Sequence, residues 1–195
     1  PRVKRLLVRR RLPTPRWRLW DRAPEDRWSC FPAIVKPAWE HCSCGVTPEA
    51  VVLNAQELAE RVEFVRTEFR QPALVEDFID GREFHVTVWG NGTVRMLPPV
   101  EMDFSRFADV HDRLCTYDSK FTPGSRHYDG IQARVPAPLS DQESARLEET
   151  AVRAYRALGC RDYARLDIRL RDGLFYVLDV NPNPDVSPDA SVACA

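Results

Sequence analysis

Apolar residues recur along the chain at two spacings, one typical of helices and one typical of strands. Val3, Leu6 and Leu7 recur at helical spacing and predict a short helix over residues 2–10. Two longer helices are predicted where a polar capping residue is followed by a glutamate and then by an apolar stripe. The first follows Asn54 and has the stripe Leu58, Val62, Val65 and Phe69; the second follows Ser140 and has the stripe Leu147, Ala151, Ala154 and Leu158.

Strands are predicted between these helices and after them. Alternating or uniformly apolar runs mark residues 31–35, 73–79, 83–89, 93–97, 163–170 and 174–180. Hairpins outnumber strand–helix–strand crossovers, so the pattern predicts an α+β fold with antiparallel sheets. Residues 98–139 are irregular and dotted with prolines, which in a compact domain is typical of a functional loop.

The composition fits a globular domain. Of the 195 residues, 44% are hydrophobic and 29% are charged, and no apolar run reaches the roughly 18 residues of a membrane span. There is no basic-then-apolar leader, and the six cysteines fit neither a disulfide framework nor a zinc site. We therefore expect a cytoplasmic protein with reduced thiols. Because the chain begins at Pro1 and not at a methionine, we also expect a fragment of a longer protein.

The positive charge is concentrated at the start of the chain. Residues 1–18 hold eight basic side chains and no acidic one, which leaves 20 basic and 29 acidic residues in the remainder. We interpret the basic segment as a solvated helix face. A nucleic-acid-binding arm is the alternative, but nucleic acid is not an expected partner because the segment lacks the fold signature of such binders.

The last predicted hairpin places polar side chains at the tip of an apolar strand. In residues 163–170 the side chains of Arg165, Asp167 and Arg169 point to one face, and the apolar ones point to the other. A two-residue turn would set Asp179 beside Leu166, away from this polar face. A three-residue turn that ends at a glycine pairs Leu170 with Leu174, sets Asp179 opposite Arg165 and brings Asp167 diagonally beside it. We predict the three-residue turn.

In this register Asp167, Asp179 and Asn181 share one face. Three oxygen ligands without sulfur or imidazole favour Mg²⁺, which commonly shares its ligand shell with water and phosphates. The alternative interpretation is a solvated polar face of a surface hairpin. Lys36 and Lys120, at a strand tip and in the irregular stretch, would supply the matching positive charge for phosphate; taken singly, each is equally well a surface lysine.

Five segments in this order resemble the ATP-grasp superfamily and, within it, the C-terminal domains of D-alanine–D-alanine ligases. They are KRLLVRRRLPTPRW, PAIVKPAWEHCSCGV, LVEDFIDGREFHVTVWGN, YDSKFTPGS and ARLDIRLRDGLFYVLDVNPNPDVSP, and they cover nearly all of the chain. The resemblance implies an ATP-grasp fold, with antiparallel sheets in two lobes that clasp ATP. Residues 1–80 would form the nucleotide-binding lobe and residues 81–195 the lobe for metal, phosphate and substrate. The N-terminal substrate domain of the family is absent from these residues.

The resemblance also implies which residues bind the nucleotide. Lys4, Lys36 and Ser43 would meet the phosphates of ATP, and Glu83 would bind the ribose hydroxyls. The adenine would be read by the Glu76 side chain and by the backbone at Asp77 and Ile79, with Phe78 and Leu178 packed near the base. These roles are assigned by similarity to the family, residue by residue.

The implied reaction is the activation of a carboxylate by ATP, followed by attack of an amine on the acylphosphate to form an amide or peptide bond. Lys120 would reach the transferring phosphate and Arg165 would face the reacting acyl group. Asp167, Asp179 and Asn181 would hold two Mg²⁺ ions, with Mn²⁺ as an alternative. The partners would be ATP and small carboxylate and amine substrates, amino acids or peptides. A homodimer stays open, as does a non-catalytic nucleotide-binding module or a truncated, inactive fragment.

Three positions depart from the family pattern. Asp179 stands where the family usually has glutamate, and Glu40-His41-Cys42-Ser43 replaces Glu-Gly-Ser-Ser in the mobile loop. Asp185 takes the place of a glycine in the substrate loop, which suggests an amino acid or peptide other than D-alanine as the second substrate.

Overall fold

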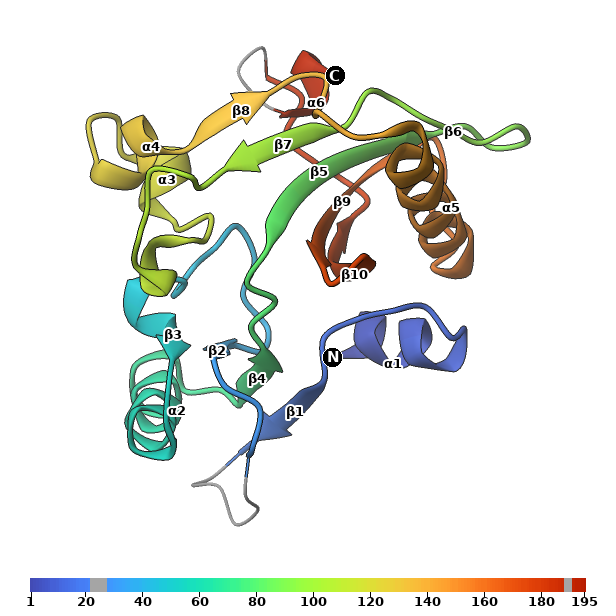
Figure 1. Cartoon of the computed structure of the whole chain (residues 1–195). Helices are drawn as coiled ribbons and strands as arrows, with labels where there is room; N and C mark the ends of the chain where they lie inside the picture. The colour runs from blue at the N-terminus through green and yellow to red at the C-terminus, as the bar shows by residue number, and fades with distance from the viewer. Residues whose placement is uncertain (22–27, 188–190) are drawn as a thin grey trace. The chain divides into compact units, whose positions relative to one another are not determined.

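The computed structural model describes residues 1–21, 28–187 and 191–195. The chain divides into two compact units (Figure 1). Unit 1 contains Pro1, Pro15–Asp80 and Phe104–Ile131, and unit 2 contains Arg2–Thr14, Gly81–Asp103 and Gln132–Ala195. The predicted lobes meet at residue 80, where the units also divide. The predicted lobes were continuous in sequence, however, whereas each unit is built from separated segments.

Unit 1 holds a four-stranded antiparallel sheet in the order β1-β4-β2-β3. Its elements are β1 (Trp17–Trp20), β2 (Ala33–Pro37), η1 (Pro48–Ala50), β3 (Val51–Val52), α2 (Ala55–Phe69), β4 (Ala73–Asp77), η2 (Val110–Asp112), α3 (Asp118–Phe121) and α4 (Arg126–Gly130).

Helix α2 forms because its first turn is capped and its apolar face is buried. The Asn54 side chain accepts hydrogen bonds from the backbone N–H groups of Gln56 and Glu57, as the predicted cap requires. Helix α2 lies beside the strands of unit 1 (Figure 1), and its stripe Leu58, Val62 and Val65 is buried in the core that it shares with the sheet.

Unit 2 holds a six-stranded antiparallel sheet in the order β10-β9-β5-β7-β8, with β6 paired to β5. Its elements are α1 (Arg2–Arg9), β5 (Arg82–Trp89), β6 (Arg95–Met96), β7 (Val100–Asp103), β8 (Gln132–Arg134), α5 (Asp141–Ala157), β9 (Tyr163–Arg171), β10 (Leu174–Asn181) and α6 (Ser191–Cys194).

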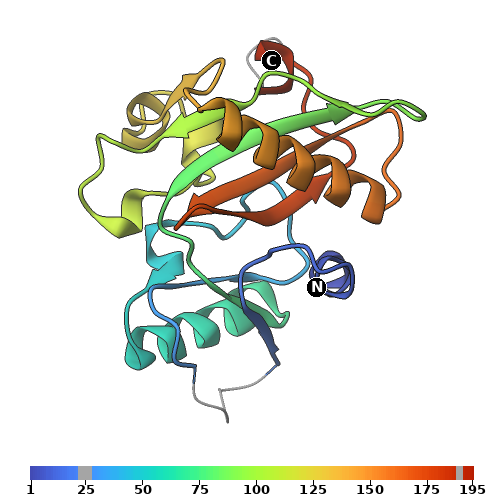
Figure 2. The same ribbon diagram turned by 45° about the vertical axis from the view of Figure 1, so that its right-hand side comes forward.

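One face of this sheet is apolar and is covered by α5, which lies across the strands (Figure 2). The shared core consists of Leu147, Ala151 and Ala154 from the helix and Phe84, Val86, Leu166, Ile168, Phe175 and Val177 from the strands. Leu166 and Ile168 therefore point into the core, as predicted. Full burial of each large apolar side chain contributes about 1.5–3 kcal/mol.

Two segments belong to a unit whose other residues are far from them in sequence, and their packing explains why. Leu7 and Leu12 are buried in the core of unit 2, so the first helix belongs with strands that come much later in the chain. Residues 104–131 belong to unit 1 because Leu114 packs with Val51 and Phe78, and because the Tyr117 N–H donates to the Val46 carbonyl (3.3 Å). None of the helices in the described residues is both long enough and apolar enough to cross a membrane.

Helix α5 offers a test of the predicted capping. The Ser140 hydroxyl accepts from the Glu143 N–H (3.3 Å), and the Glu143 carboxylate accepts from the Ser140 N–H (2.9 Å). We predict that Ser140→Ala lowers the free energy of unfolding by about 1 kcal/mol, because one helical N–H loses its partner. Urea denaturation measures this effect. Ser144→Ala, one turn further along the same helix, is the control and should change stability far less.

Candidate functional site

The hairpin between β9 and β10 has a two-residue turn, so the predicted three-residue turn is wrong. Leu174 pairs with Arg171 and Phe175 pairs with Leu170. Asp172 and Gly173 both have positive φ angles, 52° and 73°, which suits a hairpin turn that follows the twist of the strands.

A bulge in β10 nevertheless brings the predicted metal ligands together. Val177 pairs with Ile168 and Asp179 pairs with Asp167, which leaves Leu178 as one extra residue in β10. Beyond this bulge the side chains of β10 change face, so Asp179 and Asn181 leave the face of Phe175 and Val177.

The bulge therefore sets Asp179 directly opposite Asp167 and Asn181 opposite Arg165. The prediction that Asp179 lies opposite Arg165 is wrong by two residues along β9. The three oxygen-bearing side chains share the polar face of the sheet as predicted, but the bulge produces this arrangement and not the length of the turn.

Arg165 is bound to one of the two paired carboxylates. Its Nε and Nη2 atoms donate to the two carboxylate oxygens of Asp167 at 2.8 and 3.1 Å. The Asp179 side chain is exposed, and the Asn181 side-chain oxygen accepts from the Asn183 N–H (3.0 Å). The face thus offers carboxylate and amide oxygens, the ligand atoms that Mg²⁺ prefers.

Arg169, which the sequence analysis placed on this face without a role, and His85, which it missed, are two further residues of the face. Arg169 donates from Nε to Glu83 (2.7 Å), and both side chains are buried. His85 Nε2 lies 3.6 Å from Glu83 and 3.9 Å from Asp167. Both residues continue the alternation that placed Glu83 and Asp167 on the polar face, and this was the signal in the sequence.

Opposing effects act on the pKa of Glu83. Burial alone would raise the pKa of this carboxyl, but the charge of Arg169 and hydrogen bonding to His85 outweigh burial and hold the pKa well below its usual range. Glu83 is therefore a fixed negative charge, already paired, on the polar face of unit 2.

Lys4 bonds to β10 at Val177, the residue before Leu178. Lys4 is buried, with its Nζ 3.0 Å from the Thr14 hydroxyl and 3.5 Å from the Val177 carbonyl. The Thr14 hydroxyl also donates to the Val177 carbonyl (2.8 Å), and the Val177 N–H donates to Pro13 (2.9 Å). The segment after α1 thus pairs with the edge strand just before the bulge at Leu178.

The predicted adenine hinge and Lys36 lie together in unit 1. Lys36 Nζ is 2.5 Å from a carboxylate oxygen of Glu76, whose side chain is 2% exposed, and the Lys36 side chain is 26% exposed. The hinge continues beyond β4, where Phe78 and Ile79 are buried. The Asp77 N–H donates to the carbonyl of Arg16 (2.9 Å), the residue just before β1, so this backbone donor is already used.

Ser43 and Lys120 also meet in unit 1. Lys120 Nζ donates to the Ser43 hydroxyl (2.9 Å), and that hydroxyl donates to the Cys115 carbonyl (3.1 Å). Cys42 and Ser43 both have left-handed backbone conformations, with φ of 54° and 59°. In this loop Glu40-His41-Cys42-Ser43 departs from the Glu-Gly-Ser-Ser pattern that the resemblance implies.

Comparisons with known proteins identify the family of the chain. The family model described as the D-ala D-ala ligase C-terminus matches residues 17–192. A D-alanine–D-alanine ligase of Desulforudis audaxviator is 33% identical over 203 residues, which cover 98% of this chain and 61% of that protein. The chain spans about half the length of the curated relatives that it matches.

Two solved structures share the fold. The D-alanine–D-alanine ligase of Bacillus anthracis complexed with ATP gives a TM-score of 0.71 at 22% identity, covering 96% of this chain and 55% of that one. The L-amino acid ligase of Bacillus licheniformis gives a TM-score of 0.71 at 22% identity, covering 98% and 41%. The predicted α+β ATP-grasp fold is confirmed.

The buried pair of Glu83 and Arg169 predicts a dependence of stability on pH. Because the folded pKa of Glu83 is lowered, its contribution is fully present above the unfolded pKa of about 4.3 and is lost as the pH falls below it. We predict that Glu83→Gln lowers stability at pH 7 by roughly 3–5 kcal/mol, since Arg169 stays buried without its partner.

Urea unfolding of both proteins between pH 7 and pH 3 measures these effects. The loss of stability on acidification should be shallower in Glu83→Gln than in the wild type. Glu148→Gln, an exposed change on α5, should follow the wild-type curve. If the free energy of unfolding falls equally steeply below pH 4.3 in Glu83→Gln and in the wild type, protonation of Glu83 is not the cause of the lost stability.

Proposed function

The chain belongs to the family of D-alanine–D-alanine ligase C-terminal domains, and from this premise we propose that it is the nucleotide- and metal-binding part of an ATP- and Mg²⁺-dependent carboxylate–amine ligase. Such an enzyme forms an amide or peptide bond through an acylphosphate. The observation that carries the proposal is the bulge at Leu178, which sets Asp179 opposite Asp167. Two carboxylates directly opposite each other repel, and a bound cation would offset the repulsion.

The donor set fits magnesium. Asp167, Asp179 and Asn181 offer only carboxylate and amide oxygens, which favour Mg²⁺ and also suit Mn²⁺. When bound there, magnesium would supply positive charge to the phosphates of the nucleotide. The side chain of Asp179 is shorter than that of the glutamate usual in the family, so its position directly opposite Asp167 matters if both carboxylates are to bind one ion.

The residues of the chain would position the reacting groups and balance their charge. In unit 2, Arg165 would turn from Asp167 to the oxygen that becomes negative when an amine attacks the acylphosphate. In unit 1, Lys120 and Ser43 would donate to phosphate oxygens through the two groups that now bond to each other. Lys36 would donate to phosphate from its position beside Glu76.

The nucleotide base and sugar would be bound by the predicted hinge and by residues of unit 2. In unit 1, Glu76 and the backbone at Asp77 and Ile79 would read adenine, with Phe78 close to the base. In unit 2, Leu178 and Glu83 keep their predicted roles toward the base and the ribose. Lys4 would bind the phosphates of ATP, as the sequence analysis predicts. Its bonds to Thr14 and Val177 support a second role, the support of β10.

The second substrate would be an amino acid or peptide other than D-alanine. Asp185 stands at a glycine position of the family, and its carboxylate accepts from the Ser187 N–H (2.8 Å). The resulting local turn places an acidic side chain in the substrate loop. The fold shared with an L-amino acid ligase is compatible with this substrate class.

A nucleotide-binding module without ligase activity is the second candidate function. The observation that favours it is the left-handed pair Cys42 and Ser43, where the family has glycine and serine. Release of ADP on addition of amino acids to a longer protein that contains this chain would support the ligase. Tight binding of ATP with no ADP release for any amino acid or dipeptide would support the module.

We predict that Mg-ATP stabilises the chain, and that ATP with a chelator does so far less. A ligand at about 100 times its dissociation constant adds roughly 2.7 kcal/mol to the free energy of unfolding. Thermal denaturation with ATP, with and without Mg²⁺, measures the effect. Asp179→Asn should remove most of the magnesium dependence, and Asp129→Asn, an exposed change in unit 1, should leave it intact. A melting curve that Mg-ATP does not move contradicts the binding proposal.

The two lysines should respond differently to substitution. Lys120→Ala should weaken Mg-ATP binding with a change in stability of only about 0.5 kcal/mol, because Lys120 is partly exposed and bonds to a neutral hydroxyl. Lys36→Ala should weaken binding and also cost about 1–3 kcal/mol of stability, because the buried Glu76 carboxylate loses its partner. Calorimetric titration and urea unfolding separate the two effects. The double variant Lys36→Ala/Glu76→Gln should recover stability but not affinity.

A further inference from the structure

The loop from Glu40 to Gly45, here called the 40–45 loop, carries the Ser43 hydroxyl that is proposed to meet phosphate. Its first end is tied to Gln71, a residue just beyond α2 that is only 9% exposed. The Gln71 side-chain oxygen accepts from the Trp39 N–H (2.7 Å), and its side-chain nitrogen donates to the Glu40 carboxylate (2.7 Å). One buried amide thus bonds to both the backbone and the side chain at this end.

The other end of the 40–45 loop is tied to α2 by Arg61. The Nη2 atom of Arg61 donates to the Gly45 carbonyl (2.9 Å) and to the Thr47 hydroxyl (3.2 Å). Gly45 has a φ of +72°, and a Cβ atom there would lie 2.8 Å from the Phe69 ring and 2.9 Å from Pro37. The positive φ angle and the close packing therefore both require glycine at position 45, where Arg61 bonds to the loop.

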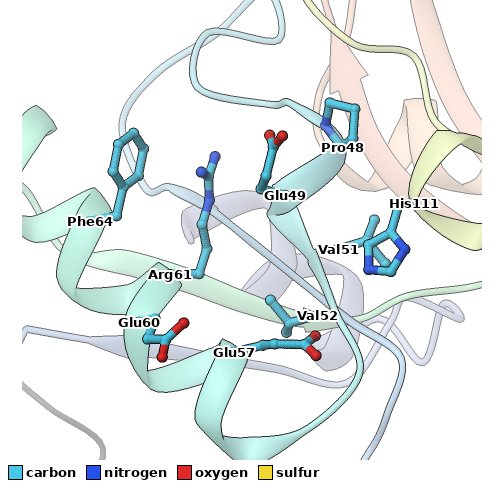
Figure 3. A pocket seen from close by; sticks show the side chains of 9 residues that line it. All are labelled: Pro48, Glu49, Val51, Val52, Glu57, Glu60, Arg61, Phe64 and His111. Atoms are coloured by element: carbon cyan, nitrogen blue, oxygen red, sulfur yellow. The ribbon is translucent and has the colours of Figure 1, made fainter.

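Arg61 is not placed to fill a core. It is 9% exposed, yet it lines an open hollow of about 510 Å³ together with Glu49, Val52, Phe64 and others (Figure 3). Its guanidinium lies 4.4 Å over the Phe64 ring. Burial lowers the pKa of Arg61, and the charge of Glu49 opposes that shift. A buried cation is costly unless its donors are used, and Nη2 of Arg61 donates to the loop at Gly45 and to Thr47, two residues beyond the loop.

In the middle of the 40–45 loop, Ser43 bonds through its hydroxyl to Lys120 and to the Cys115 carbonyl. His41 to Cys44 form a turn closed by the Cys44 N–H and the His41 carbonyl (3.1 Å). Cys42 and Ser43 adopt left-handed conformations that residues other than glycine rarely adopt. Such a conformation persists only when its surroundings determine it. Fixed ends reduce the number of conformations open to the four residues between them.

We propose that Arg61 and Gln71 are positioning residues that fix the two ends of the 40–45 loop and so hold Ser43 beside Lys120. The purpose of this arrangement, the presentation of Ser43 to phosphate, rests on the proposed function. The anchoring itself does not, and the loop contains two cysteines that report on it.

The first experiment measures alkylation of individual cysteines by iodoacetamide, followed by mass spectrometry of the peptides. Cys44 is half-buried and reports opening of the loop, and Cys160 in unit 2 is the internal reference for global unfolding. Arg61→Met should raise the rate at Cys44 about tenfold, which corresponds to about 1.4 kcal/mol, without raising the rate at Cys160. Gln71→Leu should act in the same direction and serves if Arg61→Met does not fold.

Arg66→Met on the same helix is the matched control. Arg66 bonds to Asp21 and Glu63 and not to the loop, so its loss should leave the Cys44 rate unchanged. An unchanged Cys44 rate in both folded variants, Arg61→Met and Gln71→Leu, would overturn the proposal.

The second experiment compares the affinities of wild type and Arg61→Met for Mg-ATP and for adenosine. The variant should lose about tenfold in Mg-ATP affinity and keep its affinity for adenosine, which lacks the phosphates that Ser43 would meet. If the wild type binds no Mg-ATP, the proposed function fails, and the alkylation rates alone decide whether the loop is anchored. If both ligands lose affinity equally, Arg61 is merely structural and the positioning role is refuted.

Discussion

One extra residue in β10, Leu178, determines which side chains share the polar face of unit 2. The two-residue turn fixes the register from Arg171 to Ile168, and in that register Asp179 would lie beside Leu166 with the core. The bulge moves the strand forward by one residue and sets Asp179 opposite Asp167. The apolar face is preserved by the same shift, because Val180 takes the core position that Asp179 would have filled. A single local irregularity thus keeps a carboxylate out of the core.

The polar face that results contains ion pairs between neighbouring side chains. Arg165 is bound to Asp167 and Arg169 to Glu83, so the cations of β9 compensate carboxylates on β9 and β5. Pairing of this kind holds side chains in place at a cost in desolvation. Asp179 stands out because its side chain is exposed and lies opposite another carboxylate, which is an arrangement that a bound cation would stabilise.

The sequence predicted the elements with regular patterns and missed those set by distant contacts. The caps at Asn54 and Ser140 and the alternation around Asp167 are local signals, and α2, α5 and β9 formed where they were expected. The short strands β1, β3, β7 and β8 were missed because each is only two to four residues long and leaves little periodicity in the sequence. The bulge did leave a signal in the sequence. The apolar positions of β10 run through Phe175 and Val177 and then change phase to Val180. The compact units also include segments that are remote in sequence, since residues 2–14 and 104–131 are grouped with elements far along the chain.

The bonds from Lys4 and Thr14 to Val177 have a consequence for the order in which the chain can fold. They join residues that are 173 and 163 positions apart, so α1 leaves the ribosome long before the strand that it supports. Contacts of such long range are closed late and slow the folding of a domain. The segments of unit 1 are complete once residue 131 has been synthesised, whereas unit 2 has to wait for β9 and β10. During synthesis the basic first helix therefore spends most of the time with its apolar side chains uncovered, which is the stage at which a nascent chain is most prone to aggregate or to need a chaperone.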